Sequence, residues 1–274
     1  MRNLFLFSLI GVFLILTTSC GGKYAATEKI YKKKASVFAA DYKNNPAKVQ
    51  LDKINIENRE WIGSTNFGVR APNYVVIHHT AQDSIEQTIR TFHSERAQVS
   101  AHYVIGREGE IVQMVNDLFR SHHAGLGKWG TNTDMNSSSI GIELDNNGTS
   151  DPWPDAQIES LLELLDYLKK TYKIPQGNFI GHLDYAPARK IDPANFPWDR
   201  LAEKGFGFWY DKNREPAPEN FDEKLALRII GYDVSNMDAA IKAFKKHFIQ
   251  EDDDTSELDE EEKAVLYNLM LKYL

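Results

Sequence analysis

The feature that most constrains the fold is a series of short β-rich runs that alternate with helical patterns. The runs "YVVIHHT" (74–80), "SSIGIELD" (138–145) and "NFIGH" (178–182) have the length and composition of buried strands. Residues 101–115 read as two strands around a glycine-containing turn. Because strands and helices alternate, we expect an α/β fold with a mixed central β-sheet flanked by helices.

Two helical patterns lie between the predicted strands. Ser84 followed by Gln87 forms a capping box and predicts a helix start. Between residues 155 and 172 the apolar residues fall on one helix face, which predicts an amphipathic helix that packs on the sheet.

Length and charge bound the organisation of the chain. Its 274 residues are enough for one substantial domain and a small one. We expect a main domain at 60–209, a linker at 210–222 and a module of three helices at 223–274, whose second helix begins at Ser235.

The negative charge is concentrated in one segment. Residues 251–262 contain nine acids, which is more than the whole net charge of −7, and they predict a solvated loop and helix start. The remainder of the chain is close to neutral in net charge, so we expect no nucleic-acid partner.

The N-terminus reads as an export signal. A basic Arg2 precedes an almost wholly apolar run, which is too short for a spanning helix. The single cysteine, Cys20, follows "LTTS" directly, a position that resembles a bacterial lipoprotein signal. Residues 1–20 would then be the signal, with lipid on the Cys20 thiol anchoring the protein to a membrane, and 21–59 a tether. The alternative is an ordinary cleaved signal with an incidental cysteine.

Glu143 lies inside the otherwise apolar strand "IGIEL". Ile140 and Ile142 share one face of this strand, and Gly141 and Glu143 share the other. A buried carboxyl has a raised pKa, which suits a general acid or base near neutral pH. The alternative is a strand whose outer face meets solvent.

Histidines close the first and the last of these strands. His78 and His182 are the two, and carboxylates follow the second at Asp184 and Asp192. Two histidines and one aspartate leave a tetrahedral zinc ion with an open position for water. In extended chain Asp192 shares a side with Lys190, and Asp184 shares one with His182, so spacing leaves the choice of aspartate open.

Five motifs together resemble the zinc-dependent N-acetylmuramoyl-L-alanine amidases, the family shared with phage T7 lysozyme and the peptidoglycan recognition proteins. They are "YVVIHHT", "SAHYVIGREGEIVQMV", "SHHAG", "SSIGIEL" and "GHLDYAPARKIDP". The resemblance covers roughly residues 60–205. The last three helical patterns are similar to the helical peptidoglycan-binding module of outer-membrane lipoprotein amidases.

The resemblance implies roles at particular positions. It makes His78, His182 and Asp192 the ligands of one zinc ion per chain. It makes Glu143 the catalytic acid/base and Lys190 the residue that stabilises the oxyanion.

Four further residues are candidates for substrate contact. His123 and Asn136 fall near substrate-contacting positions of the family, and Trp129 is a candidate wall for sugar or peptide. Arg189 carries a guanidinium fork that suits a peptide carboxylate, although a surface role fits it equally.

The implied activity is hydrolysis of the amide between the lactyl group of N-acetylmuramic acid and L-alanine of the stem peptide. The implied partners are peptidoglycan or muropeptides, together with a membrane through Cys20. We expect a monomer at the outer membrane, facing the periplasm. The alternatives are a catalytically silent peptidoglycan-binding protein and a zinc peptidase that acts on the stem peptide.

Overall fold

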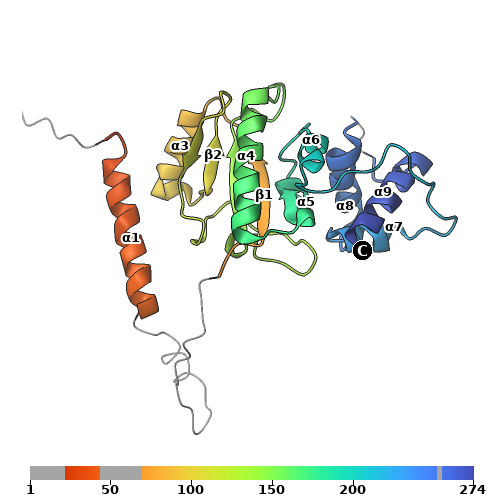
Figure 1. The fold of residues 1–274 in the computed structure, drawn as a ribbon, viewed down its shortest axis with the longest axis horizontal. Helices are drawn as coiled ribbons and strands as arrows, with labels where there is room; N and C mark the ends of the chain where they lie inside the picture. The colour runs from red at the N-terminus through yellow and green to blue at the C-terminus, as the bar shows by residue number, and fades with distance from the viewer. Residues whose placement is uncertain (1–21, 44–69, 252–254) are drawn as a thin grey trace, which may run out of the picture. The chain divides into compact units, whose positions relative to one another are not determined.

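The computed structural model describes residues 22–43, 70–251 and 255–274 (Figure 1). The predicted signal and Cys20 lie outside the described residues. Helix α1 (Ala25–Lys43) occupies the described part of the predicted tether. No helix within the described ranges is long and apolar enough to cross a bilayer. Gly68–Leu274 forms a compact unit of its own, and the site lies within it.

A five-stranded sheet forms the centre of this unit. Its strand order is β3-β2-β4-β1-β5. The strands are β1 (Tyr74–His79), β2 (Tyr103–Ile105), β3 (Ile111–Gln113), β4 (Ser139–Leu144) and β5 (Phe179–Gly181). β1 pairs in parallel with β4 and β5, β2 pairs in parallel with β4, and β3 runs antiparallel to β2. The predicted mixed sheet is confirmed, and the carboxyl ends of its parallel strands meet at one edge, where open α/β sheets bind ligands.

The strand register brings two polar side chains to that edge. β1 and β4 align so that His78 lies opposite Glu143. Partners in adjacent strands point to the same face of a sheet, so both side chains leave on one side. Ile140 and Ile142 point to the other face and are fully buried. The alternation read from the sequence therefore separates a packing face from a polar face.

Helices cover the sheet. α3 (Ile85–His93) begins at Ser84, whose side chain accepts a hydrogen bond from the backbone N–H of Gln87, as predicted. α4 (Asp155–Tyr172) spans the predicted residues and lies alongside the strands (Figure 1). Its Gln157 amide donates to the carbonyl oxygens of Ile105 and Asp145, which ties the helix to the ends of β2 and β4. Short helices complete this part: η1 (Glu95–Ala97), η2 (Met135–Ser137), η3 (Gln176–Asn178), α5 (His182–Tyr185) and α6 (Trp198–Glu203).

The C-terminal segment contains the three predicted helices. They are α7 (Glu223–Ile230), α8 (Met237–Phe244), which continues into the π-helical turn η4 (Lys245–Ile249), and α9 (Glu260–Tyr273). The predicted start of the second helix was one residue early, because the Asn236 side chain, not that of Ser235, accepts from the backbone N–H of Ala239. The Ser235 N–H instead donates to Asp233 in the preceding turn.

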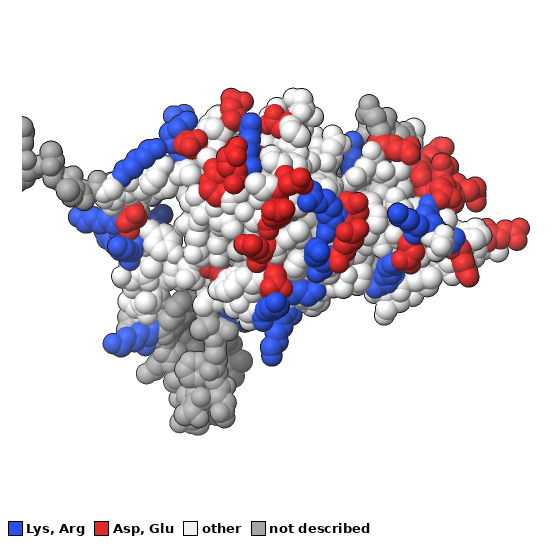
Figure 2. Space-filling model, turned by 45° about the horizontal axis from the view of Figure 1, so that its top comes forward, with Lys and Arg blue, Asp and Glu red and all other residues white. Residues whose placement is uncertain are grey.

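The acidic run ends where α9 begins. Asp259 caps the helix, and Glu260, Glu261 and Glu262 fill its first turn, where acids favour the helix dipole. Figure 2 shows acidic side chains gathered over the C-terminal helices, whereas the rest of the visible face mixes both signs of charge. The helices share one continuous hydrophobic core with the sheet. The division at 210–222 into a main domain and a separate module stays a prediction.

Two tyrosines that share one carboxylate, the buried Tyr103 and the partly buried Tyr172, are expected to make stability fall at alkaline pH. The hydroxyls of Tyr103 and Tyr172 donate to the two carboxylate oxygens of Asp117, at 2.7 and 2.8 Å. Burial, then the Asp117 carboxylate, raises the pKa of both phenols above the ordinary 10.0. Their contribution to stability is complete below pH 10 and is lost as the pH rises above it, because only the unfolded chain ionises there.

We therefore expect Tyr103→Phe to flatten the fall in unfolding free energy between about pH 9 and 11, measured by urea denaturation. Tyr167→Phe is the control, since the Tyr167 side chain is 53% exposed. An unchanged slope in Tyr103→Phe would contradict the assignment.

Candidate metal centre and active site

Three ligand-type atoms converge at the carboxyl ends of β1 and β5. His78 ends β1, His182 opens α5 directly after β5, and Asp192 lies in the loop that follows. The Nδ1 atoms of the two histidines are 3.0 Å apart, and each lies 3.0 to 3.1 Å from Asp192 Oδ2. All three side chains are buried. Among the described residues they form a group of His, Cys, Asp or Glu side chains close enough to hold one metal ion.

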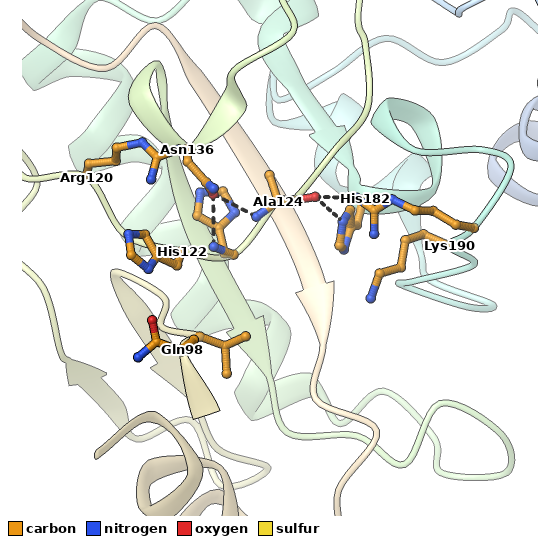
Figure 3. Close-up of a pocket in the computed structure, with 11 residues that line it drawn as sticks. Gln98, Arg120, His122, Ala124, Asn136, His182 and Lys190 are labelled. Carbon is orange, nitrogen blue, oxygen red and sulfur yellow. Dashed lines mark hydrogen bonds between the residues drawn. The ribbon is translucent and has the colours of Figure 1, made fainter. Parts of the chain in front are cut away.

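The hydrogen bond behind His182 fixes which of its nitrogens faces this cluster. Its Nε2 lies 2.8 Å from the carbonyl oxygen of Ala124 (Figure 3). A carbonyl accepts only, so Nε2 carries the proton and donates. In the neutral ring, Nδ1 then has a bare lone pair directed at His78 and Asp192.

The cluster fits a divalent cation better than it fits internal hydrogen bonds. Burial, then the His182 ring, lowers the pKa of His78 to about 4, so the His78 imidazole is neutral near pH 7. Burial of the Asp192 carboxyl opposes ionisation, but the contacts with His182 and His78 outweigh it and lower its pKa. The two imidazole Nδ1 atoms and the Asp192 carboxylate face one point. This donor set suits zinc with an open coordination position.

Glu143 lies one strand away on the same face. Its Oε2 is buried and has no hydrogen-bond partner among the described residues. Burial, then the charge of Asp192, raises the pKa of Glu143 well above its ordinary value, while Lys190 opposes the rise. An unpartnered buried carboxyl oxygen is costly unless it has a task, and a raised pKa suits proton transfer. Of the two interpretations of this residue, the structure supports the one in which the carboxyl is partly buried, since its Oε2 is shielded from solvent.

Asp184 does not join the cluster. The chain is helical after Gly181, so the extended geometry that would have placed Asp184 beside His182 does not occur. The Asp184 carboxylate instead accepts from the backbone N–H of Gly181, the Tyr232 hydroxyl and His247 Nδ1. It therefore braces α5 against the C-terminal segment, and Asp192, not Asp184, is the aspartate that lies with His78 and His182.

A cavity of about 360 Å³ opens beside the cluster (Figure 3). This volume is typical of small-ligand sites. His182 and Lys190 line it from one side and Asn136 from the other, with Arg120 and Arg189 at its wall. The lining carries basic groups and no carboxylate.

Two of the expected substrate-contacting residues of this wall make internal contacts. Asn136 Oδ1 accepts from the backbone N–H groups of His123 and Ala124, at 3.0 and 2.9 Å. The Arg189 guanidinium donates to the carbonyl oxygens of Ala124 and Leu126. Both residues thus hold the loop that carries His123.

Trp129 lies elsewhere. Its indole is 5% exposed and packs edge-on against Tyr232, with ring centroids 5.0 Å apart. It does not line the cavity beside the metal cluster. The expectation that it forms a wall of the substrate site is therefore corrected, because this indole belongs to the core between the sheet segment and the C-terminal helices.

Sequence reasoning missed two partners of the site. Ser139 lies on the same face of β4 as Gly141 and Glu143, and this period of two was the signal that could have found it. His247, which contacts Asp184, belongs to a helix whose packing partner no local pattern identifies.

Two histidines and an aspartate that could hold one metal ion lie beside the unpartnered carboxyl oxygen of Glu143. This arrangement is typical of metal-dependent hydrolases, and that is the class of protein to which the fold and the site point. The model of the N-acetylmuramoyl-L-alanine amidase family matches residues 68–195. With the relatives below, this match shows that the chain belongs to that family.

Two relatives show how far the similarity extends. N-acetylmuramoyl-L-alanine amidase AmiD of Escherichia coli (strain K12) is 33% identical over 231 residues, which are 73% of this chain and 82% of that protein. The 1,6-anhydro-N-acetylmuramyl-L-alanine amidase AmpD of Haemophilus influenzae is 39% identical over 123 residues, 43% of this chain and 66% of its own length.

Solved structures agree with this assignment. AmiD from E. coli in complex with the substrate anhydro-N-acetylmuramic acid-L-Ala-D-gamma-Glu-L-Lys has a TM-score of 0.66 at 31% identity, covering 77% of this chain and 93% of that one. AmpDh3 from Pseudomonas aeruginosa in complex with anhydromuramic pentapeptide has a TM-score of 0.67 at 29% identity, covering 80% and 99%.

Proposed function

We propose that this N-acetylmuramoyl-L-alanine amidase uses zinc to cleave the amide between the lactyl group of N-acetylmuramic acid and L-alanine in peptidoglycan or muropeptides. The observation that carries the proposal is the pairing of a buried His-His-Asp cluster with the unpartnered carboxyl of Glu143, on one face at one edge of the sheet. A silent binding protein would have no use for a costly buried carboxyl at this position.

Each residue of the site has a task in this reaction. Zinc held by His78, His182 and Asp192 would supply Lewis-acid chemistry, polarising the scissile carbonyl and acidifying water. Glu143 takes the proton from the attacking water and returns it to the leaving amine, for which its raised pKa is suited. Lys190 lines the same cavity and places a positive charge where the oxyanion develops.

The cavity wall fits an acidic substrate. Stem peptides carry free carboxylates, and the residues that line the cavity include Arg120, Arg189 and Lys190 and no acid. Arg120 is paired with Asp134 outside the lining and Arg189 donates to backbone carbonyls, so Lys190 is the cation we propose for the substrate carboxylate. The AmiD and AmpDh3 structures hold anhydromuramyl peptides, and we propose the same substrate class here. Cell-wall turnover or recycling is the corresponding role.

The N-terminal sequence supports a place in the cell envelope. We propose that Cys20 carries the lipid anchor and that the protein is a monomer at the outer membrane, facing the periplasm. Labelling of cells with a fatty-acid analogue tests the anchor, since Cys20→Ser should remove the label.

Digestion of purified muropeptides with and without a chelator tests the activity. We expect intact stem peptide and a glycan product with a free lactyl group, seen by mass spectrometry, with loss of both on chelation and recovery with added Zn²⁺. A shortened stem peptide would favour the zinc peptidase instead. An uncut substrate that is retained by the zinc-loaded protein would favour the silent binding protein.

A further inference from the structure

We propose that the dipeptide His123-Ala124 is the outer support of the metal centre, and that His123 is a positioning residue for His78 rather than a contact for substrate. The inference deepens the proposed function, because it concerns how the same site holds its metal. It rests on the contacts that this dipeptide makes behind both metal-site histidines.

A directed chain of hydrogen bonds runs outward from His78. His78 Nε2 lies 2.9 Å from His123 Nδ1, and His123 Nε2 lies 3.2 Å from Ser139 Oγ. The Ser139 hydroxyl donates to the carbonyl oxygen of Met135 at 2.6 Å. A carbonyl cannot donate, so it fixes the direction of the whole chain: Ser139 Oγ accepts from His123 Nε2–H, and His123 Nδ1 accepts from His78 Nε2–H.

The consequence for His78 is a defined tautomer. Its proton is held on Nε2, which leaves the Nδ1 lone pair facing Asp192 and His182. A hydrogen bond from the far nitrogen of a metal-binding histidine orients the ring and raises its basicity as a ligand.

Ala124 fixes the tautomer of the second histidine, His182. Its carbonyl oxygen accepts from His182 Nε2 at 2.8 Å and from the Arg189 guanidinium at 2.6 Å. Two consecutive residues, one through its side chain and one through its backbone, therefore set the tautomers of both His78 and His182.

The surrounding residues hold the dipeptide in place. Asn136 Oδ1 bonds the backbone N–H of both residues, and reaches them from the side opposite His182 (Figure 3). The His123 ring lies against Gly141, where an added Cβ would come within 2.3 Å of His123 Cγ. The absence of a side chain on Gly141 thus makes the space that the ring needs beside His78.

These contacts leave His123 little capacity for substrate. Both of its ring nitrogens are engaged, one by His78 and one by Ser139. Its neighbour His122 is exposed at the same cavity, and within the described chain its hydrogen bonds go to Ser100 and to no metal-site residue. The two adjacent histidines therefore provide a matched pair for separating the two roles.

Zinc affinity without substrate, measured by competition with a chromophoric chelator, tests the proposal. His123→Leu removes the acceptor at Nδ1, and we expect it to weaken Zn²⁺ binding about tenfold to hundredfold. His123→Asn keeps an acceptor oxygen near Nδ1 and should recover part of that loss. Ser139→Ala, which removes only the far end of the chain, should give a smaller loss, and His122→Leu should leave Zn²⁺ affinity within about twofold of the parent.

A second readout is the absorption spectrum of bound Co²⁺, which reports ligand geometry. We expect the His123 variants to shift its visible bands, and the His122 variant to leave them in place. Zn²⁺ affinity and Co²⁺ spectra that are unchanged in both His123→Leu and His123→Asn, with a raised KM for muropeptides, would overturn the proposal in favour of substrate contact. Because neither metal readout needs turnover, they stand even if the proposed hydrolysis is not observed.

Discussion

Glu143→Gln is expected to abolish muropeptide turnover while zinc stays bound. The amide keeps the size of the side chain but cannot accept the proton of the attacking water or return it to the leaving amine. General acid–base catalysis contributes about 10² to 10⁴ in rate, so kcat should fall by at least that range. The neutral amide also removes a buried, unpartnered carboxyl, and we expect no loss of folding stability.

The measurement is kcat on a defined muropeptide, with zinc content determined on the same sample. Glu163→Gln is the matched control, because it makes the same chemical change at an exposed position of α4. If Glu143→Gln turned over substrate at the parent rate, Glu143 would not be the acid/base. A loss of zinc together with activity would assign it to the metal site instead.

Asp192→Ala is expected to lose zinc, whereas Asp184→Ala keeps most of it. Asp192 presents Oδ2 to both histidine Nδ1 atoms, so its removal takes away one of three ligand-type atoms. We expect a fall in Zn²⁺ affinity larger than the tenfold to hundredfold that loss of an outer partner costs. Asp184 is not part of the cluster, and its hydrogen bonds go to Gly181, Tyr232 and His247 instead.

The same pair should behave in the opposite way in thermal unfolding of the metal-free proteins. Asp184 is fully buried and accepts three hydrogen bonds, so Asp184→Ala should lower the midpoint clearly more than Asp192→Ala. Metal analysis of the purified variants measures the zinc content, and calorimetry in the presence of a chelator measures the unfolding midpoint of the metal-free proteins. Greater zinc loss in Asp184→Ala than in Asp192→Ala would overturn the ligand assignment.

Much of the fold could be predicted because its elements follow local rules. Residues 75–77 of β1 are buried on both faces and read as a continuous apolar segment, and α4 shows a helical period over its whole length. The start of a helix depends on a single side-chain contact, and for this reason the start of α8 was predicted one residue early, at Ser235. Asn236 and Ser235 are both good caps, and only the turn before them selects one.

The sequence indicated which residues form the site but not how they are placed relative to one another. The alternation along β4 placed Glu143 on the polar face, whereas its position opposite His78 depends on strand order and register, which local sequence does not encode. The choice between Asp184 and Asp192 depended on a single helical turn after Gly181, which reverses the direction that extended chain would give.

The substrate-contacting residues were the least predictable part. Trp129 lies in a loop and Asn136 in the three-residue helix η2, which are both too short or irregular for a sequence period to give the direction of a side chain. The Trp129 indole is buried by Tyr232, which is more than a hundred positions later in the chain. Contacts of this kind follow from tertiary packing alone.

The hydrogen bonds between Asp184 and the C-terminal segment limit how far this protein can be truncated. The helix that begins with a metal-site histidine is fastened by Tyr232 and His247, and His247 itself lies stacked between Trp198 and Phe248. A shortened enzyme that ends before residue 223 would lose these fastenings and expose the indole of Trp129. A minimal catalytic fragment of this amidase should therefore be sought by redesigning the surface around Asp184 and Trp129, and not by deletion alone.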